Sequence, residues 1–199
     1  MVFLNVALLG LVAGKLLGGQ LRNLAGTQIR GTWLVFAAVA LQLVAFPSDA
    51  LPWSTPTGVA KGLWLVSYAL LITMIVRNRS LPGALIVGAG LACNLVAILA
   101  NGGLMPVRRG ALAASGGNYH VHNNSIQVVQ PHLSFLVDRW GAPHWLPLAN
   151  VFSVGDVLIA VGTVVAIVAA MKAPTAAEAW DGGGANLRLY TGTVPATTN

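Results

Sequence analysis

The feature that most constrains the fold is a series of five apolar stretches separated by polar or basic turns. The stretches lie at about residues 2–19, 33–46, 58–76, 81–100 and 151–171. A helix needs about 20 apolar residues to cross the hydrocarbon core of a bilayer, and it satisfies its own backbone hydrogen bonds there. Only 8% of the residues are charged, whereas soluble domains have about 25%. The sequence therefore predicts an all-α fold, a polytopic transmembrane helix bundle of about five transmembrane helices.

Local signals divide the chain into a membrane domain, one long loop and a tail. Pro82 lies in the first turn of the fourth stretch, where a missing N–H group costs no helical hydrogen bond. The Asn-Gly-Gly turn at residues 101–103 ends that stretch. We therefore expect residues 1–172 to form the transmembrane helical domain, with residues 101–150 as a long extracytoplasmic loop. Residues 173–199 lack the apolar content needed for a core, which predicts a disordered cytoplasmic tail.

The long loop contains its own apolar segment between residues 125 and 140. The segment carries Ile126, Val128, Val129, Leu133, Phe135, Leu136 and Trp140. This content is enough for a short helix that lies on the bilayer surface or folds back onto the bundle. We therefore expect an ordered outer loop.

The basic residues are divided unevenly between the two ends of the predicted helices. With the N-terminus outside, the inner set has seven members: Lys15, Arg22, Arg30, Arg77, Arg79, Lys172 and Arg188. The outer set has four: Lys61, Arg108, Arg109 and Arg139. Because cytoplasmic loops of membrane proteins are enriched in Lys and Arg, we predict a multi-pass protein of the bacterial inner membrane with its C-terminus in the cytoplasm. The lipid bilayer is then the expected partner. Nucleic acid is not expected as a partner, because the sequence has no basic stripe interleaved with aromatic residues.

Three glycines at a spacing of four residues mark one face of the first stretch. They are Gly10, Gly14 and Gly18. Residues four apart share a helix face, and a row of glycines lets another backbone approach closely. The row serves either helix packing inside the monomer, which we favour, or a dimer face.

Asp156 is the most informative single residue, because an ionisable group in an apolar stretch is expensive to bury and often functional. Two interpretations remain open. Ser153 and Asp156 have the Ser-x-x-acid spacing of a capping box, which would place the acid near the positive end of the last helix. Alternatively, Asp156 contacts a ligand or carries a proton, and the two roles are compatible.

Other polar residues fall near the same depth. Asn94 lies about two helical turns before Asn101, and buried amides in lipid need hydrogen-bond partners. If the fourth and fifth helices are neighbours, these amides face the outer third of the bundle. We therefore take Asn94, Asn101, Ser153 and Asp156, together with Asp138 from the loop, as candidate ligand-binding residues, and we identify no catalytic residue.

All four histidines of the chain lie in the long loop. His120 and His122 would point to one side of an extended strand, and imidazole is a common metal ligand. With Asp138 nearby they form a candidate metal site, although no HExxH or similar spacing accompanies them. The single Cys93 excludes a disulfide within one chain. The cofactor, if there is one, stays unknown.

Several motifs together resemble a known family. They comprise the turn at residues 101–106, the Phe-Leu-x-Asp element at 135–138, residues 151–159, residues 16–24 and the Arg-Asn-Arg turn at 77–82. The chain resembles domain-of-unknown-function family 5317, whose members are small bacterial membrane proteins. The resemblance implies a multi-helix inner-membrane protein, and it implies no activity, cofactor or catalytic residue.

These observations favour a non-enzymatic protein. We expect a membrane subunit or a small-ligand-binding protein whose polar site lies at the outer ends of the fourth and fifth helices. Its protein partners would be other membrane chains or further copies of itself. One alternative is a metal-dependent membrane enzyme or redox protein that uses the loop histidines. Another is a small transporter with Asp156 as the coupling group.

Overall fold

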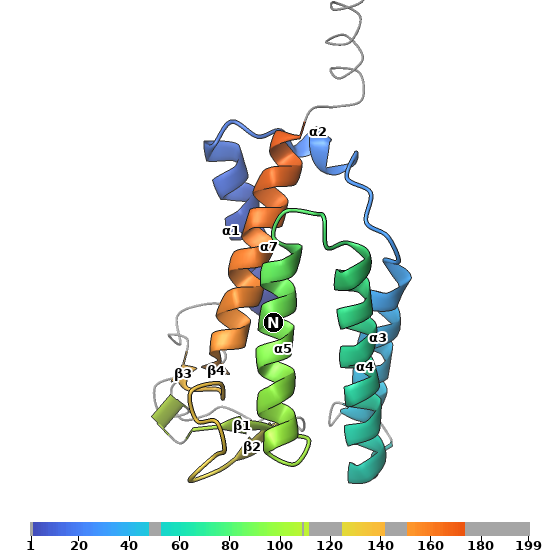
Figure 1. The fold of residues 1–199 in the computed structure, drawn as a ribbon, viewed down its shortest axis with the longest axis vertical. Coiled ribbons are helices and arrows are strands. Elements are labelled where there is room, and N and C mark those ends of the chain that lie inside the picture. Colours follow the sequence, from blue (N-terminus) through green and yellow to red (C-terminus); the bar gives the residue numbers. More distant parts are fainter. Residues whose placement is uncertain (1, 48–52, 109, 112–124, 142–150, 174–199) are drawn as a thin grey trace, which may run out of the picture.

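The structure is a computed structural model of the 199-residue chain. It describes residues 2–47, 53–108, 110–111, 125–141 and 151–173. Within these ranges the helices are α1 (Val2–Leu16), α2 (Leu21–Leu24), α3 (Trp33–Ala45), α4 (Thr57–Arg77), α5 (Ala84–Ala100) and α7 (Val154–Lys172). The five longer helices run alternately up and down (Figure 1).

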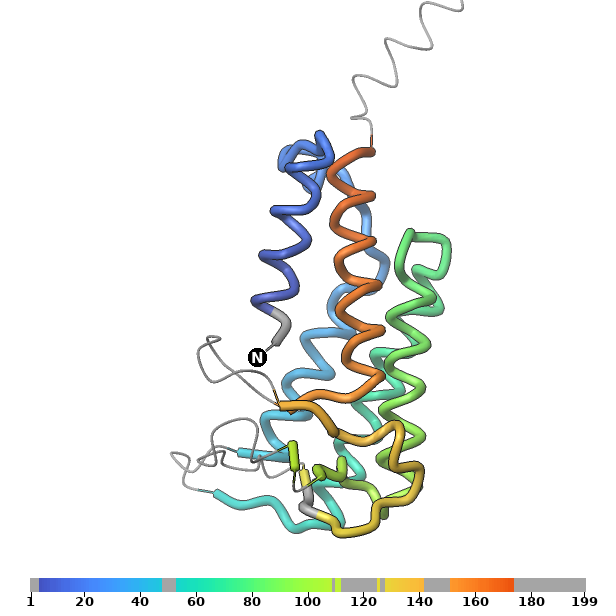
Figure 2. Tube along the Cα trace, turned by 90° about the vertical axis from the view of Figure 1, so that its left-hand side faces the viewer, coloured from blue at the N-terminus to red at the C-terminus, as the bar shows by residue number. Residues whose placement is uncertain are grey.

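Two names for the ends of the bundle follow from Figure 1. The strand end carries four short β-strands. The basic end carries α2, the turn between α4 and α5, and the last residue of α7, Lys172. Figure 2 shows α1 and α7 side by side, both rising toward the basic end.

The helices follow the five predicted stretches closely, but only two of them are long and apolar enough by themselves to cross a membrane. These two are α4 and α7, whereas α1, α3 and α5 are shorter apolar helices. The predicted helical fold is therefore confirmed as a mostly helical chain, in which two helices are candidate membrane spans; the five spans stay a prediction. The first predicted stretch is also too long. Gly18 takes a left-handed backbone conformation with a φ of 83° just beyond α1, which ends at Leu16, and such a residue terminates a helix.

The strand end departs from the predicted all-α fold. Strand β1 (Met105–Val107) pairs in parallel with β2 (Ser125–Gln127), and β3 (Trp140–Gly141) pairs antiparallel with β4 (Val151–Phe152). The surface helix expected between residues 125 and 140 is absent from the described residues of that segment. The reason is that several of its backbone groups pair with other strands: Asp138 donates its N–H group to the carbonyl of Pro106 in β1 at 3.1 Å, and Arg139 donates to the carbonyl of Phe152 in β4 at 3.2 Å.

Helices α5 and α7 pack with their backbones almost in contact. A Cβ atom built on Gly162 of α7 would lie 2.7 Å from the carbonyl oxygen of Gly83, and one built on Gly90 of α5 would lie 2.8 Å from the side chain of Ile159. Real Cβ atoms do not approach other heavy atoms this closely, so only glycine fits at these positions. Such small-residue contacts are typical of helices that associate in membranes.

Two of the three glycines singled out in the first stretch face α7. A Cβ atom on Gly10 would lie 2.9 Å from Ile167, and one on Gly14 would overlap the Met171 side chain. Gly18 lies beyond the end of α1 and has no atom within 4 Å of its ideal Cβ position. The close approach thus involves α7 of the same chain and only the first two glycines.

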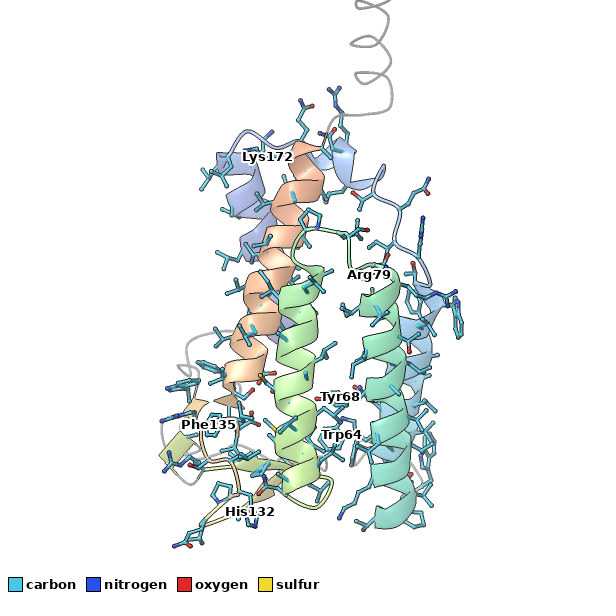
Figure 3. All side chains as sticks on the ribbon, in the orientation of Figure 1. Trp64, Tyr68, Arg79, His132, Phe135 and Lys172 are labelled. Atoms are coloured by element: carbon cyan, nitrogen blue, oxygen red, sulfur yellow. The ribbon has the colours of Figure 1, made fainter. Side chains whose placement is uncertain are left out.

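Helices α3 and α4 form a second packed pair. The Gln42 amide donates to the Ser67 hydroxyl at 3.0 Å, and Ser67 donates to the carbonyl of Trp64 at 2.7 Å. Phe46 packs edge-on against Trp64 with ring centroids 5.0 Å apart. Trp64 and its neighbour one turn on, Tyr68, point from α4 toward α5 in Figure 3. There they join the main hydrophobic core, whose buried members are Trp64, Tyr68, Leu91, Ala97, Ile98, Met105, Leu136 and Ile159.

Candidate functional site

The close approach of α5 and α7 brings three of the candidate residues together. Gly155, in the first turn of α7, has no side chain, and an added Cβ would overlap the Asn94 amide oxygen. Asn94 of α5 therefore reaches directly into the first turn of α7, where Ser153 and Asp156 lie. We call Asn94, Ser153 and Asp156 the polar cluster.

The hydrogen bonds of the polar cluster are short and mutual. Asn94 donates from Nδ2 to Asp156 Oδ1 at 2.9 Å. The Ser153 hydroxyl lies 2.8 Å from Asn94 Oδ1 and 2.9 Å from Asp156 Oδ2, and it can donate to one of them at a time. The cluster thus joins an amide, a hydroxyl and a carboxylate from two helices.

The cluster is also the start of helix α7. The backbone N–H of Asp156 donates to Ser153 Oγ at 3.1 Å, and the backbone N–H of Ser153 donates to Asp156 Oδ2 at 2.9 Å. This reciprocal pair is the capping box that the Ser-x-x-Asp spacing predicts. Both carboxylate oxygens of Asp156 are occupied by donors from the protein itself.

Two further residues lie beside the cluster. The Tyr68 hydroxyl of α4 interacts with the Asn94 side chain, which extends the polar contacts to a third helix. Tyr68 is not predictable as a site residue, because the third apolar stretch is apolar all round and does not reveal which face meets α5. Asp138, from the segment between β2 and β3, is only 7% exposed and carries a charge interaction with Asp156.

Asp138 has the most perturbed environment of the candidate residues. Its backbone bridges to Val107 of β1, and its N–H group donates to the carbonyl of Pro106. Burial, and secondarily the negative charge of Asp156, raises the pKa of this carboxyl from 3.8 to about 8. Asp138 is therefore protonated at neutral pH while lying close to a carboxylate, which is an arrangement that often accompanies function.

The remaining candidates lie apart from the cluster. Asn101 holds the loop against the end of α5: its amide accepts from the backbone N–H of His132 at 2.9 Å and donates to the carbonyl of His132 at 3.0 Å. His120 and His122 lie outside the described residues. Among the residues that the structure describes, no group of three or more His, Cys, Asp or Glu side chains could hold a metal ion.

Comparisons with known proteins add one finding. Neither the curated proteins nor the solved structures gave a match. The profile of a family of unknown function, DUF5317, matches residues 26–168, which include α3, α4, α5, the strand end and most of α7. The match covers well over half of the chain, so the chain belongs to the DUF5317 family of proteins of unknown function.

Proposed function

We propose that this chain is a non-enzymatic subunit in the bacterial inner membrane, with five spans, its N-terminus outside and its C-terminus in the cytoplasm. The observation that carries the non-enzymatic part is the polar cluster. Asn94, Ser153 and Asp156 direct their hydrogen-bonding groups at one another. A catalytic site needs such groups aimed at the place where a substrate reacts. The cluster therefore fits a structural contact that holds α5 against α7 better than an active site.

The surface of the helices supports the membrane placement. Large apolar side chains are exposed on all five longer helices, among them Leu8, Leu9, Phe36, Val66, Leu85 and Val161. A soluble monomer rarely exposes apolar area on this scale. The short helices α1 and α5 pack along α7, and α3 packs along α4. If α4 and α7 cross the bilayer, their packing carries the other three across with them.

The charge distribution supports the orientation. In the part of the chain that the structure describes, the basic end carries six basic residues: Lys15, Arg22, Arg30, Arg77, Arg79 and Lys172. The strand end carries three: Lys61, Arg108 and Arg139. Because the positive-inside bias assigns the richer side to the cytoplasm, the strand end would face outward.

Cysteine labelling tests the topology. In a Cys93→Ala background, Ser80→Cys places a thiol in the turn between α4 and α5, and Gln130→Cys places one at the strand end. Both positions are exposed. We expect a membrane-impermeant maleimide to label Gln130→Cys in right-side-out vesicles and Ser80→Cys only in inverted vesicles. Labelling of both from the same side would contradict the proposed spans, and labelling after detergent lysis controls for thiol reactivity.

Native mass spectrometry of protein released from nanodiscs tests the subunit role. We expect the chain to leave the membrane with another protein chain, or with a second copy of itself, at fixed stoichiometry. A bare chain without partner or small molecule would contradict the proposal.

A second candidate function is small-ligand binding, and the observation that favours it is Asp138. A buried carboxyl with a pKa of about 8 keeps its proton at neutral pH and can donate a hydrogen bond to a ligand oxygen. In the same mass spectra, a retained small molecule that disappears in Asp138→Asn and stays in the control Arg139→Gln would favour this function. A partner chain that is unaffected by either variant would favour the subunit role instead.

A further inference from the structure

Three arginines from two segments surround a hollow at the basic end of the bundle. The hollow has a volume of about 540 Å³ and is lined by Arg30, Gly31, Trp33, Arg77 and Arg79. Arg30 precedes α3, whereas Arg77 and Arg79 lie at the end of α4. Figure 3 labels Arg79 at the upper end of α4. The strand-end polar cluster lies at the far end of the bundle, so this hollow is a separate feature.

Asn78 fixes the arginines relative to one another. It lies between Arg77 and Arg79 in the sequence and is only 4% exposed. Its Oδ1 accepts from the backbone N–H of Arg30 at 2.8 Å, and its Nδ2 donates to the carbonyls of Arg30 and Met74, each at 2.8 Å. A buried side chain with this many partners holds the segment before α3 against the end of α4, so the hollow is built into the fold.

The charges at the hollow are not neutralised by the described residues. All three arginines are exposed, and none of them forms an ion pair within the described ranges. The two acidic residues in those ranges, Asp138 and Asp156, belong to the strand end. The Arg79 guanidinium donates a long hydrogen bond of 3.3 Å to the carbonyl of Val76. Three like charges held together therefore favour an anion between them.

Arginine indicates what kind of anion fits. Its planar guanidinium presents paired N–H donors that match the oxygens of a phosphate group. Trp33 lies at the same hollow and is 62% exposed, and tryptophan is enriched where a membrane protein meets the headgroup region. Basic pockets at the cytoplasmic side of membrane helices bind the headgroups of anionic lipids.

We propose that the hollow formed by Arg30, Arg77 and Arg79 binds a phosphate group, with the headgroup of an anionic phospholipid as the favoured source. The choice of a lipid source rests on the proposed membrane placement, whereas the binding of phosphate does not. The site is distinct from the polar cluster, and it gives the inner side of the protein a preference for anionic lipids.

The test uses the full chain in three preparations, analysed by native mass spectrometry. The first is in nanodiscs of phosphatidylglycerol, the second in nanodiscs of phosphatidylcholine, and the third in phosphatidylcholine with inorganic phosphate in the buffer. The variant Arg77→Gln/Arg79→Gln removes two charges at the hollow and leaves Asn78 in place. The matched control Arg108→Gln/Arg139→Gln removes the same charge at the strand end. Arg79→Gln alone serves as a second variant, should the double variant not fold.

We expect the wild-type chain and the control to retain one phosphatidylglycerol per chain, and the double variant to retain it about tenfold less, since hydrogen bonds to charged groups are lost. Inorganic phosphate bound in the third preparation, with the same dependence on Arg77 and Arg79, would support the site and make a soluble phosphate its ligand. Equal retention of both lipids, or equal retention by variant and control, would overturn the proposal. Binding of inorganic phosphate in the third preparation does not depend on how the chain crosses the membrane. A failure of the proposed topology in the labelling experiment can therefore be told apart from a failure of the phosphate site.

Discussion

Gly155→Ala is expected to destabilise the folded protein by about 3 to 5 kcal/mol, the sum of overpacking and of a broken buried hydrogen-bond network. The added Cβ would overlap the Asn94 amide oxygen and lie 2.7 Å from the carbonyl oxygen of Gly90. The carbonyl belongs to the backbone of α5 and cannot rotate away, so the two helices must separate. Separation in turn withdraws Asn94 from Ser153 and Asp156, because all three meet at this crossing.

Thermal unfolding of the purified protein in mild detergent measures this effect. Gly62→Ala in α4 is the matched control, because Gly62 has no atom within 4 Å of its ideal Cβ position. There alanine should stabilise the helix by roughly 0.5 to 1 kcal/mol through its better helix propensity. An unfolding temperature for Gly155→Ala equal to that of Gly62→Ala would show that α5 and α7 do not approach as closely as described.

Asp138→Asn is expected to stabilise the protein above neutral pH, which is unusual for the loss of a buried polar group. In the folded state the pKa of Asp138 is raised to about 8, against 3.8 for an ordinary Asp. Between these two values the unfolded chain has released the proton that the folded chain retains, so the wild-type stability falls as pH rises from about 4 to about 8. Above pH 8 both states are deprotonated and this contribution stays constant.

Asparagine removes the buried charge and its repulsion with Asp156. The stability of the variant should therefore not fall between pH 4 and pH 8 as that of the wild type does. A pKa difference of about 4 corresponds to roughly 5 kcal/mol, and we expect a stabilisation on the order of 3 to 5 kcal/mol at pH 8 and little difference at pH 4. Unfolding curves of both proteins between pH 4 and pH 9 provide the measurement. Parallel pH dependences for the two proteins would refute a raised pKa at Asp138.

Asp156→Asn provides the contrast for that experiment. The Asp156 carboxylate accepts hydrogen bonds from Asn94 and from the backbone of Ser153. In the variant one of these two carboxylate oxygens becomes an NH₂ group, which is itself a donor. The N–H group that donated to that oxygen then has no acceptor, which is costly for a buried group. The same chemical change should therefore destabilise the protein at position 156 and stabilise it at position 138.

The sequence was informative where local patterns determine the structure. Helix bounds follow from the alternation of apolar stretches with Pro, Gly and basic turns, and the capping box follows from the spacing of Ser153 and Asp156. Predicting the contact of Asn94 with the capping box requires one further assumption, namely that the fourth and fifth apolar stretches form neighbouring helices. The structure has that arrangement, because glycines on both helices let the backbones meet.

Other features depend on partners that are distant in the chain. Strands β1 and β2 are three residues each and too short to carry an alternating pattern. The burial of Asp138 is not predictable from the sequence, because a buried loop residue leaves no periodic apolar pattern. The link between Asn78 and Arg30 joins residues 48 positions apart through one amide side chain, and the Arg-Asn-Arg sequence reads equally well as a simple basic turn.

The packing of α1 against α7 has a consequence for how the chain is made. The partners of Gly10 and Gly14 are Ile167 and Met171, which follow more than 150 residues later. At synthesis rates of about 5 to 20 residues per second, the first helix waits on the order of 10 to 30 s before its partner is translated. During that interval the glycine face of α1 lacks the α7 side chains against which it packs. The contact of α1 with α7 thus forms only after α3, α4 and α5 have been translated, so α1 lacks this packing partner for most of the synthesis of the chain.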